Sequence, residues 1–403
     1  MLSLVAKDAA AQEPPRFLIE TIRVAGTQRV AAGRIVTDES LLKPGQSYSE
    51  QELRLAVYRI KRLPFVVDAE FSLEKGSERG AYELVITVEE AKPLFFLADV
   101  WGRSSRVKFS RGRSSDTDWT GYGSVGGRYF VGNHGLVFGS VQKGEGQDGE
   151  VLQGGYTQYN LFGAGSFASV GVSSAVGLDH QKDLQGALVV GIPLTAVQSL
   201  RGSVGWYQVE ATQRFPYSVD GSVSQTGSRF ERWSSDLSWI YDTTDDPLFP
   251  SSGLKLVAGG SYAQDENSFR LSPPVAGVDL TQSSSYYAVN LSGRRHWAVA
   301  PRQSVSLSLG VSRSRFSYDY GYAGTELRGV AAMGYALDLL GFGADGRRGD
   351  LRFESEIGGE YDDFSSPLGS STKRAYVQAG LAYRTSWGLA RLSFIYEDVW
   401  SSL

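Results

Sequence analysis

The residue types most often used in catalysis and metal binding are sparse in this chain of 403 residues. It contains no Cys, which excludes disulfides and thiolate chemistry. Its three His residues, His134, His180 and His296, are scattered, and none lies in a serine or carboxylate pattern typical of a triad or a metal site. We interpret them as loop or rim residues and expect no enzyme activity, no cofactor and no metal. A hydrolase is kept as an alternative.

One acidic segment, YDTTDDPLFPSSGLKL, has a composition that predicts a defined turn. Asp and Pro favour turns, and Gly allows a backbone conformation that other residues resist. An acidic turn could also bind a cation, so that alternative stays open. The residues that set the pattern are Asp242, Asp245, Asp246, Phe249, Pro250 and Gly253.

Residues 16–93 change period in a fixed order that predicts a small α+β domain. FLIETIRVAG alternates like a strand, and a short helical stretch follows around residues 30–37. LKPGQ reads as a turn. Ser49 and Glu52 then form a capping box ahead of a helix with apolar residues at spacings of three and four. Two further alternating strands complete the order β-α-α-β-β. The domain has 12 basic and 12 acidic residues, so nothing indicates a nucleic-acid partner.

From residue 94 to residue 403 the helical period disappears and short alternating segments follow one another. In SVSLSLGVSRS, Val305, Leu307, Leu309 and Val311 share one face, while the other face is mostly serine. No run approaches the roughly 18 apolar residues of a spanning helix, so a membrane protein of this kind must be a closed β-barrel. At about 19 residues per strand and loop, this region predicts roughly 16 antiparallel strands with lipid outside and a wet lumen.

Two alternatives bear on this division of the chain. A soluble β-sandwich or β-helix also alternates, but its solvent face usually carries Lys and Glu, whereas here that face is small and uncharged. Residues 1–15 read as the remnant of a leader or as a disordered tail.

The segments IRVAG, LKPGQSYSEQEL and LPFVVDAEFSLE resemble a POTRA domain. The acidic turn segment and the region around Arg328 resemble the β-barrel of the same superfamily, the bacterial surface antigens that include BamA and TamA. The resemblance implies that Phe249, Pro250 and Gly253 belong to a mid-barrel turn that launches the next strand. Members usually add a strand after the equivalent of GLARLSFIYEDVW. Here, either this segment closes the barrel or a closing strand is missing beside Phe95.

The resemblance also assigns GYAGTELRGVAAMGYALDLL to a long sixth extracellular loop that folds into the lumen, with Arg328 and Gly329 at its tip. Val330 departs from the aromatic residue usual after this Gly. An Arg in a partly dry lumen needs carboxylate partners, and the family places them on the next two strands. By that correspondence we expect Asp338 and Glu356 to fix the loop; the alternative is a solvated surface Arg.

The function implied is an outer-membrane barrel that inserts or translocates polypeptides, with the POTRA domain in the periplasm capturing clients by β-strand addition. The partners implied are unfolded outer-membrane or secreted polypeptides, the lipid bilayer and periplasmic accessory proteins. The chain has no phosphate-binding glycine loop, which agrees with the absence of nucleotide outside the inner membrane. The alternative function is a passive pore or structural barrel with a periplasmic tether.

Overall fold

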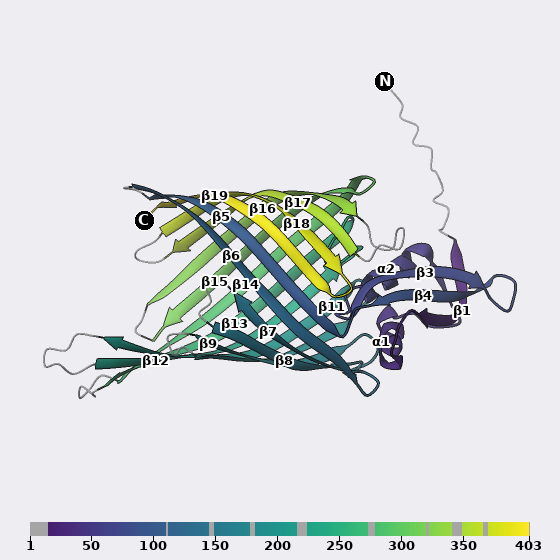
Figure 1. Cartoon of the computed structure of the whole chain (residues 1–403), viewed down its shortest axis with the longest axis horizontal. Helices are drawn as coiled ribbons and strands as arrows, with labels where there is room; N and C mark the ends of the chain where they lie inside the picture. The colour runs from purple at the N-terminus through teal and green to yellow at the C-terminus, as the bar shows by residue number, and fades with distance from the viewer. Residues whose placement is uncertain are drawn as a thin grey trace, which may run out of the picture.

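The computed structural model consists of a small N-terminal domain attached to one end of a β-barrel (Figure 1). It describes residues 15–109, 112–144, 149–177, 182–215, 224–272, 279–319, 322–340, 349–365 and 370–402. The leader or tail expected at residues 1–15 lies outside these residues except for Pro15.

The N-terminal domain is a four-stranded sheet with two helices and the strand order β2-β1-β4-β3. The predicted order omitted one short strand, β2, which pairs with the start of β1 just before the second helix. Four residues are too few to give a recognisable alternation. The elements are β1 (Arg16–Ala25), α1 (Val30–Ser40), β2 (Gln46–Ser49), α2 (Glu50–Ile60), β3 (Val66–Lys75) and β4 (Ala81–Glu90).

The second helix, α2, forms where the sequence predicted it. The Ser49 hydroxyl accepts a hydrogen bond from the Glu52 N–H at 3.3 Å, and the Glu52 carboxylate accepts one from the Ser49 N–H at 2.7 Å. This capping box satisfies two N–H groups that have no partner within the helix. Leu53 and Ile60 lie on the face of α2 that packs in the core of the domain, and both are fully buried. Capping and burial together fix how α2 lies on the domain.

In the part of the chain that the structure describes, the barrel has 15 strands, one fewer than the roughly 16 expected. Neighbouring strands are antiparallel except at the closure, where β19 pairs with β5 in parallel from Gly388 beside Phe96 to Trp400 beside Lys108. An odd number of up-and-down strands leaves the first and last pointing the same way, so this pair must be parallel. The segment GLARLSFIYEDVW is therefore the closing strand. The barrel strands are β5 (Leu94–Phe109), β6 (Gly112–Val131), β7 (Gly135–Gly144), β8 (Gly149–Tyr159), β9 (Phe167–Gly177), β10 (Lys182–Pro193), β11 (Gln198–Phe215), β12 (Ser224–Asp242), β13 (Gly253–Ser272), β14 (Asp279–Ala300), β15 (Gln303–Tyr318), β16 (Ala323–Leu340), β17 (Gly349–Ser365), β18 (Ser370–Thr385) and β19 (Gly388–Ser402).

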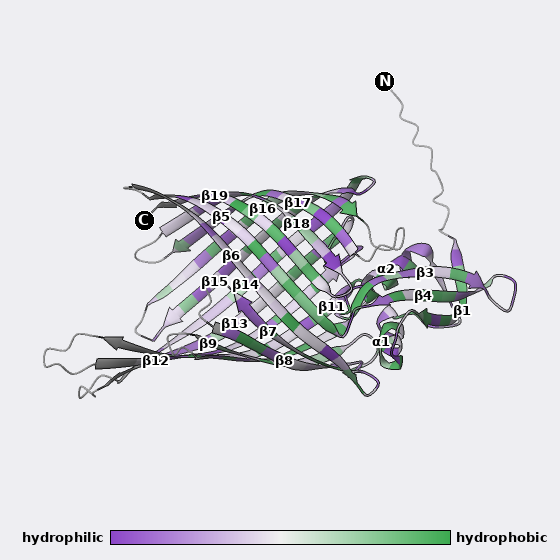
Figure 2. Ribbon diagram, viewed as in Figure 1, coloured by the Kyte–Doolittle hydropathy of each residue, from purple (hydrophilic) through white to green (hydrophobic). Residues whose placement is uncertain are grey.

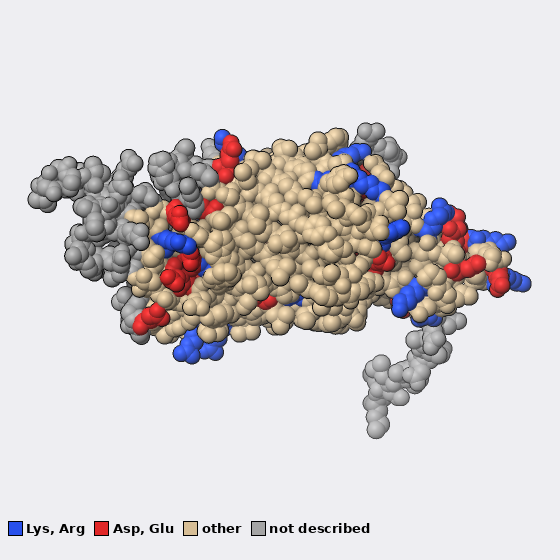
Figure 3. All heavy atoms as spheres, turned by 90° about the horizontal axis from the view of Figure 1, so that it is seen from below, with Lys and Arg blue, Asp and Glu red and all other residues tan. Residues whose placement is uncertain are grey.

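Apolar side chains point outward from the barrel, and small polar ones point inward, as the alternation predicted. In β15, Ser304 and Ser306 are 3% and 6% exposed, whereas Leu309 is 57% exposed. The alternation is visible along the strands in Figure 2. On the face shown in Figure 3, charged residues gather near the two ends, and the band between them is almost free of them. Such a band is typical of a barrel that crosses a bilayer.

Among the described residues, no helix combines the length and the apolarity of a transmembrane helix.

The N-terminal domain packs directly on the barrel mouth. Phe65 is fully buried, with its ring 4.9 Å from that of Phe130 at the end of β6 and 6.3 Å from that of Tyr159 at the end of β8. The Arg59 guanidinium donates to the Gly165 carbonyl at 3.2 Å. Because this core is continuous with the domain's own core, the domain is held in one place relative to the barrel.

Candidate functional site

The acidic segment forms the turn between β12 and β13, at the end of the barrel that carries the N-terminal domain. One Asp245 oxygen accepts hydrogen bonds from the N–H groups of Ser251 and Ser252 at 2.9 and 3.1 Å. Asp246 accepts from the N–H groups of Leu248 and Phe249 at 2.8 and 2.7 Å. These carboxylates satisfy N–H groups that would otherwise lack partners, as Asp does in turns.

Gly253 ends this turn in a conformation that only glycine adopts readily. Its φ is +108°, and a Cβ placed there would lie 2.4 Å from the Thr243 carbonyl oxygen. The structural role that the sequence predicted for Gly253 is therefore required by the backbone.

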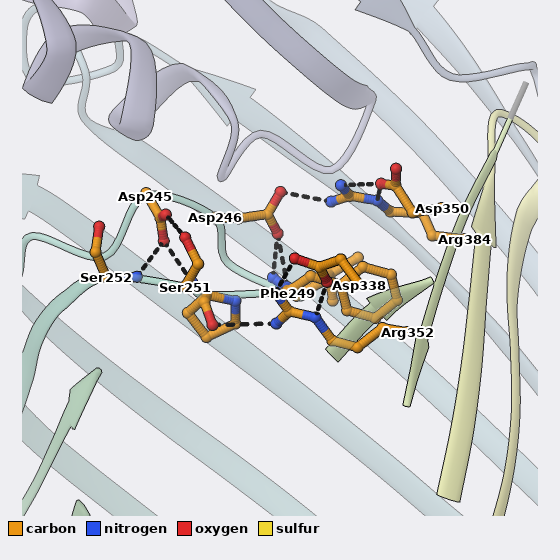
Figure 4. A network of polar contacts seen from close by, with 11 residues as sticks. Asp245, Asp246, Phe249, Ser251, Ser252, Asp338, Asp350, Arg352 and Arg384 are labelled. Carbon is orange, nitrogen blue, oxygen red and sulfur yellow. Dashed lines mark hydrogen bonds and ion pairs between the residues drawn. The ribbon is translucent and has the colours of Figure 1, made fainter. Parts of the chain in front are cut away.

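The turn also reaches across the lumen to the far wall of the barrel, as Figure 4 shows. The second oxygen of Asp246 accepts a hydrogen bond from Arg384 of β18 at 2.7 Å. Arg384 also donates to Asp350 of β17, at 2.9 Å from its Nε. Its side chain is only 9% exposed. Arg384 thus bridges two strands of the far wall and the β12–β13 turn.

A second buried arginine completes the network. Arg352 of β17 donates to Asp338 of β16 at 2.5 Å and to the Pro250 carbonyl at 3.0 Å. The Phe249 ring lies near both guanidinium groups, with its centroid 5.2 Å from Cζ of Arg352 and 5.0 Å from Cζ of Arg384. Both separations are within the range of a cation–π interaction. We call Asp246, Phe249, Asp338, Asp350, Arg352 and Arg384 the turn network.

The charges of the turn network compensate one another. Burial alone would raise the pKa of Asp246, but the Arg384 guanidinium and the N–H groups of Phe249 and Leu248 outweigh it and hold the pKa below its ordinary value. Asp246 is therefore ionised at neutral pH. A network of paired, buried charges fixes geometry because any displacement leaves a charge unpaired.

Arg62, which follows α2, connects the N-terminal domain to the same turn. Its guanidinium contacts the Asp242 carboxylate at 2.9 Å and donates to the carbonyls of Asp242 and Thr244 at 3.3 and 3.1 Å. A continuous set of polar contacts therefore runs from the N-terminal domain through the turn to β16, β17 and β18.

The expected position of Arg328 and Gly329 in a loop is wrong. They lie inside strand β16, not at the tip of a long loop, and only residues 319–322 separate β15 from β16. Arg328 faces the lumen and pairs with Glu360 and Asp362 of β17. Gly329 faces outward, and a Cβ there would meet nothing within 4 Å. The segment is a strand because its backbone pairs with β15 and β17 along nearly its whole length.

The expected carboxylate partners bind other cations. Asp338 pairs with Arg352, as described above. Glu356 accepts hydrogen bonds from Arg294 of β14 at 2.7 Å and from the Tyr376 hydroxyl at 2.8 Å. Both residues do face the lumen. They were expected to pair with Arg328 because that residue was placed in a loop folded into the lumen, whereas it lies in strand β16.

Part of the barrel matches a known protein family. Residues 160–330 match the family model described as the Omp85 superfamily domain, a stretch that contains the β12–β13 turn and Arg328. This chain carries an Omp85 superfamily domain. The expected superfamily is confirmed for these residues, and the protein is a β-barrel of the bacterial outer membrane preceded by one small POTRA-like domain.

Three solved structures show a low similarity to this chain. BamA from Haemophilus ducreyi lacking POTRA domains 1–3 is 12% identical, over 95% of this chain and 84% of that one, with a TM-score of 0.38. CdiB from Acinetobacter baumannii is 11% identical, over 96% and 74%, with a TM-score of 0.41. CdiB from Escherichia coli is 13% identical, over 95% and 87%, with a TM-score of 0.34. No curated protein matches the sequence.

A series of lumenal ion pairs extends from the Omp85 domain across the barrel closure. Arg328 of β16 pairs with Glu360 of β17, which lies 3.3 Å from Arg374 of β18. Arg374 lies 3.7 Å from Glu397 of β19, and Glu397 pairs with Arg103 of β5. The last pair crosses the parallel contact between β19 and β5. We did not predict these ion pairs from the sequence, although each charged residue alternates with outward-facing apolar residues in its own strand.

The histidines differ in their surroundings. His134 lies in the β6–β7 turn, as expected, 3.5 Å from Asp38 of the N-terminal domain. His296 is instead a buried residue of strand β14. His180 lies outside the described residues. Within the parts of the chain that the structure describes, no group of three or more His, Asp or Glu side chains could hold a metal ion.

Proposed function

We propose that this protein inserts polypeptides into the outer membrane or moves them across it, and that its periplasmic domain captures them by strand addition. The observation that carries the proposal is an Omp85 superfamily domain whose barrel mouth is packed against a domain with open sheet edges.

Strand β3 offers the longer of the two sheet edges. Its described residues pair with β4 on one side only, from Val66 to Lys75, whereas the other edge strand, β2, has only four residues. An unpaired edge binds an extended peptide through backbone hydrogen bonds, with little sequence preference. Because β3 begins next to Phe65, which contacts the barrel, a peptide added along β3 would have one end at the barrel mouth.

The closure between β5 and β19 supports a route from the lumen to the bilayer. It is the only parallel pair among the described strands of the barrel. Parallel pairing is slightly less stable per residue than antiparallel pairing. We therefore place the opening of the barrel at this closure.

The turn network weighs against a passive pore. It joins the β12–β13 turn to the far wall at the periplasmic end of the lumen, where an open channel would need free space. A passive pore remains the competing function, and it makes different predictions for conductance and for the outer-membrane proteome.

Depletion of the protein, followed by a quantitative census of outer-membrane and secreted proteins, tests the proposal. We expect a defined subset to fall in abundance, and the purified barrel to show little steady conductance in a planar bilayer. An unchanged proteome together with a large, steady conductance would instead establish the passive pore.

A further inference from the structure

The outer surface of the barrel has an apolar hollow of about 890 Å³ across strands β10 to β16. Its sides are large outward-facing residues, of which Leu188, Val204 and Leu237 are 49%, 51% and 56% exposed. Tyr287 and Val289 of β14 continue the apolar surface. Each of these residues faces away from the lumen, so the hollow opens toward the bilayer.

The hollow exists because small residues interrupt the apolar wall. Gly202, Ser235 and Gly260 face outward between the larger side chains and form the floor. A Cβ added at Gly202 or Gly260 would meet no atom closer than 3.8 or 3.5 Å, respectively. Tight backbone packing therefore does not explain these glycines, and the space above them is free for a ligand.

Two arginines, Arg313 and Arg315, lie at the β15 side of the hollow. They face outward in register with Val289 and Tyr287 of β14. Both side chains are exposed, and within the described residues neither forms a hydrogen bond or an ion pair. Two cations on one strand face, about 7 Å apart along the strand, thus lie beside an apolar hollow without a protein partner.

The position of these arginines along β15 places them at the outer boundary of the apolar band. β15 begins at the periplasmic end with Gln303, and Leu307, Leu309 and Val311 precede Arg313 on the outward face. Ten residues of a tilted strand rise about 25 Å, which is roughly the height of the apolar band of an outer-membrane barrel. Arg313 and Arg315 therefore lie at the headgroup level of the outer leaflet.

A lipid-facing arginine at this depth costs about 0–1 kcal/mol and gives no folding advantage without a partner. Guanidinium groups bind phosphate through paired hydrogen bonds, and an apolar trough next to them accommodates acyl chains. The lipid of the outer leaflet that combines phosphates with several acyl chains is lipopolysaccharide.

We infer that Arg313 and Arg315, together with the hollow floored by Gly202, Ser235 and Gly260, form a binding site for the phosphorylated, acylated portion of lipopolysaccharide. The arginines bind its phosphates, and acyl chains lie in the hollow. The site lies on the outer surface of the barrel, whereas the turn network lies in the lumen. The lipid site therefore does not depend on the proposed function.

Titration of the full-length protein in a non-ionic detergent with diphosphoryl lipid A, followed by native mass spectrometry, tests this site. We expect R313Q/R315Q to bind at least tenfold more weakly than the wild type. The matched control is R295Q, because Arg295 is also exposed and outward-facing but lies at the periplasmic end beside Trp297. R295Q should bind as the wild type does. No binding by the wild type, or an equal loss in R295Q, would overturn the proposal.

A second variant and two further lipids separate the two parts of the site. G260L fills the hollow without a backbone clash and should also weaken lipid A binding at least tenfold, while the folded barrel keeps its heat-dependent mobility on a gel. Dephosphorylated lipid A and phosphatidylglycerol should both bind at least tenfold more weakly than diphosphoryl lipid A. Equal binding of either lipid, or unchanged binding by G260L, would contradict the assignment.

Discussion

Arg384 and Arg328 both face the lumen, but their environments differ in a way that predicts different effects of substitution. Arg384 is 9% exposed, and its partners Asp246 and Asp350 are 11% and 12% exposed. R384Q would take the paired cation away from the buried Asp246 carboxylate, and breaking a buried ion pair costs about 3–5 kcal/mol. We expect a corresponding loss in the free energy of unfolding, measured by urea titration of the barrel in detergent.

Arg328 supplies the control for that experiment. Its side chain is half exposed, and Glu360 would keep Arg374 as a partner after R328Q. Because the Arg328 guanidinium is half exposed and the buried Glu360 keeps a cation, R328Q should cost only about 1 kcal/mol and unfold at nearly the wild-type urea concentration. If R328Q were as unstable as R384Q, the distinction between the two arginines would be wrong.

Glu39 of α1 predicts a pH dependence in the periplasmic domain. Burial raises its pKa to about 7 even though Arg59 lies 2.8 Å away. Because the folded pKa is above the ordinary 4.5, the stabilisation from protonated Glu39 is complete below pH 4.5 and is lost as the pH rises through about 7. Between pH 5 and pH 8 this amounts to about 3 kcal/mol at most.

Hydrogen-exchange protection factors for α1 and α2 in the full-length protein measure this effect. Wild-type protection should be greater at pH 5 than at pH 8, and E39Q, which is neutral throughout, should remove most of the difference. Equal pH dependence in E39Q would show that another group is responsible.

At the scale of elements, the sequence predicted those features that depend on residues close together in the chain. The α2 capping box, the outward alternation of β15 and the β12–β13 turn all depend on neighbouring residues, and the structure contains each of them. The partners of Arg328 and Asp338 depend on strand register across the barrel, which no local pattern contains. The same limit explains why Arg352 and Arg384, distant in sequence from the turn, were not recognised as its partners.

The parallel closure allows a direct test of register and of the proposed route. Ser104 of β5 faces Tyr396 of β19 on the outward side. Because the chain has no Cys, S104C/Y396C introduces a single pair that we expect to form a disulfide on mild oxidation and so to hold the closure shut. Delivery of clients in reconstituted vesicles should then fall at least tenfold and recover on reduction. S104C/F394C, which is two residues out of register, should not cross-link.

Full activity of the oxidised S104C/Y396C protein would exclude the β5–β19 closure as the route. It would leave the capture of clients by the periplasmic domain untested by this pair, because that domain contributes no residue to the closure. The two parts of the proposed function can therefore be examined separately.

For the whole molecule, the contacts of Arg62 imply that the periplasmic domain and the lumenal turn network behave as one mechanical unit. Arg62 is the residue of this domain that contacts the β12–β13 turn through both the carboxylate and the carbonyl of Asp242. R62A should remove about 2 kcal/mol from the docking of the domain, since hydrogen bonds to charged groups contribute about 1.5–3 kcal/mol. Phe65 would still hold the domain on the barrel, so the expected result is a broader range of orientations, not detachment.

Spin labels on the exposed β3–β4 turn and on the β10–β11 turn would measure that range as the width of their distance distribution. The control is R54A, because Arg54 lies on the exposed side of α2 and its ion pair is with Glu50 of the same helix. R54A should leave the distribution unchanged. If R62A also leaves it unchanged, the aromatic contacts alone determine the position of the domain, and a captured peptide could not signal to the turn network through Arg62.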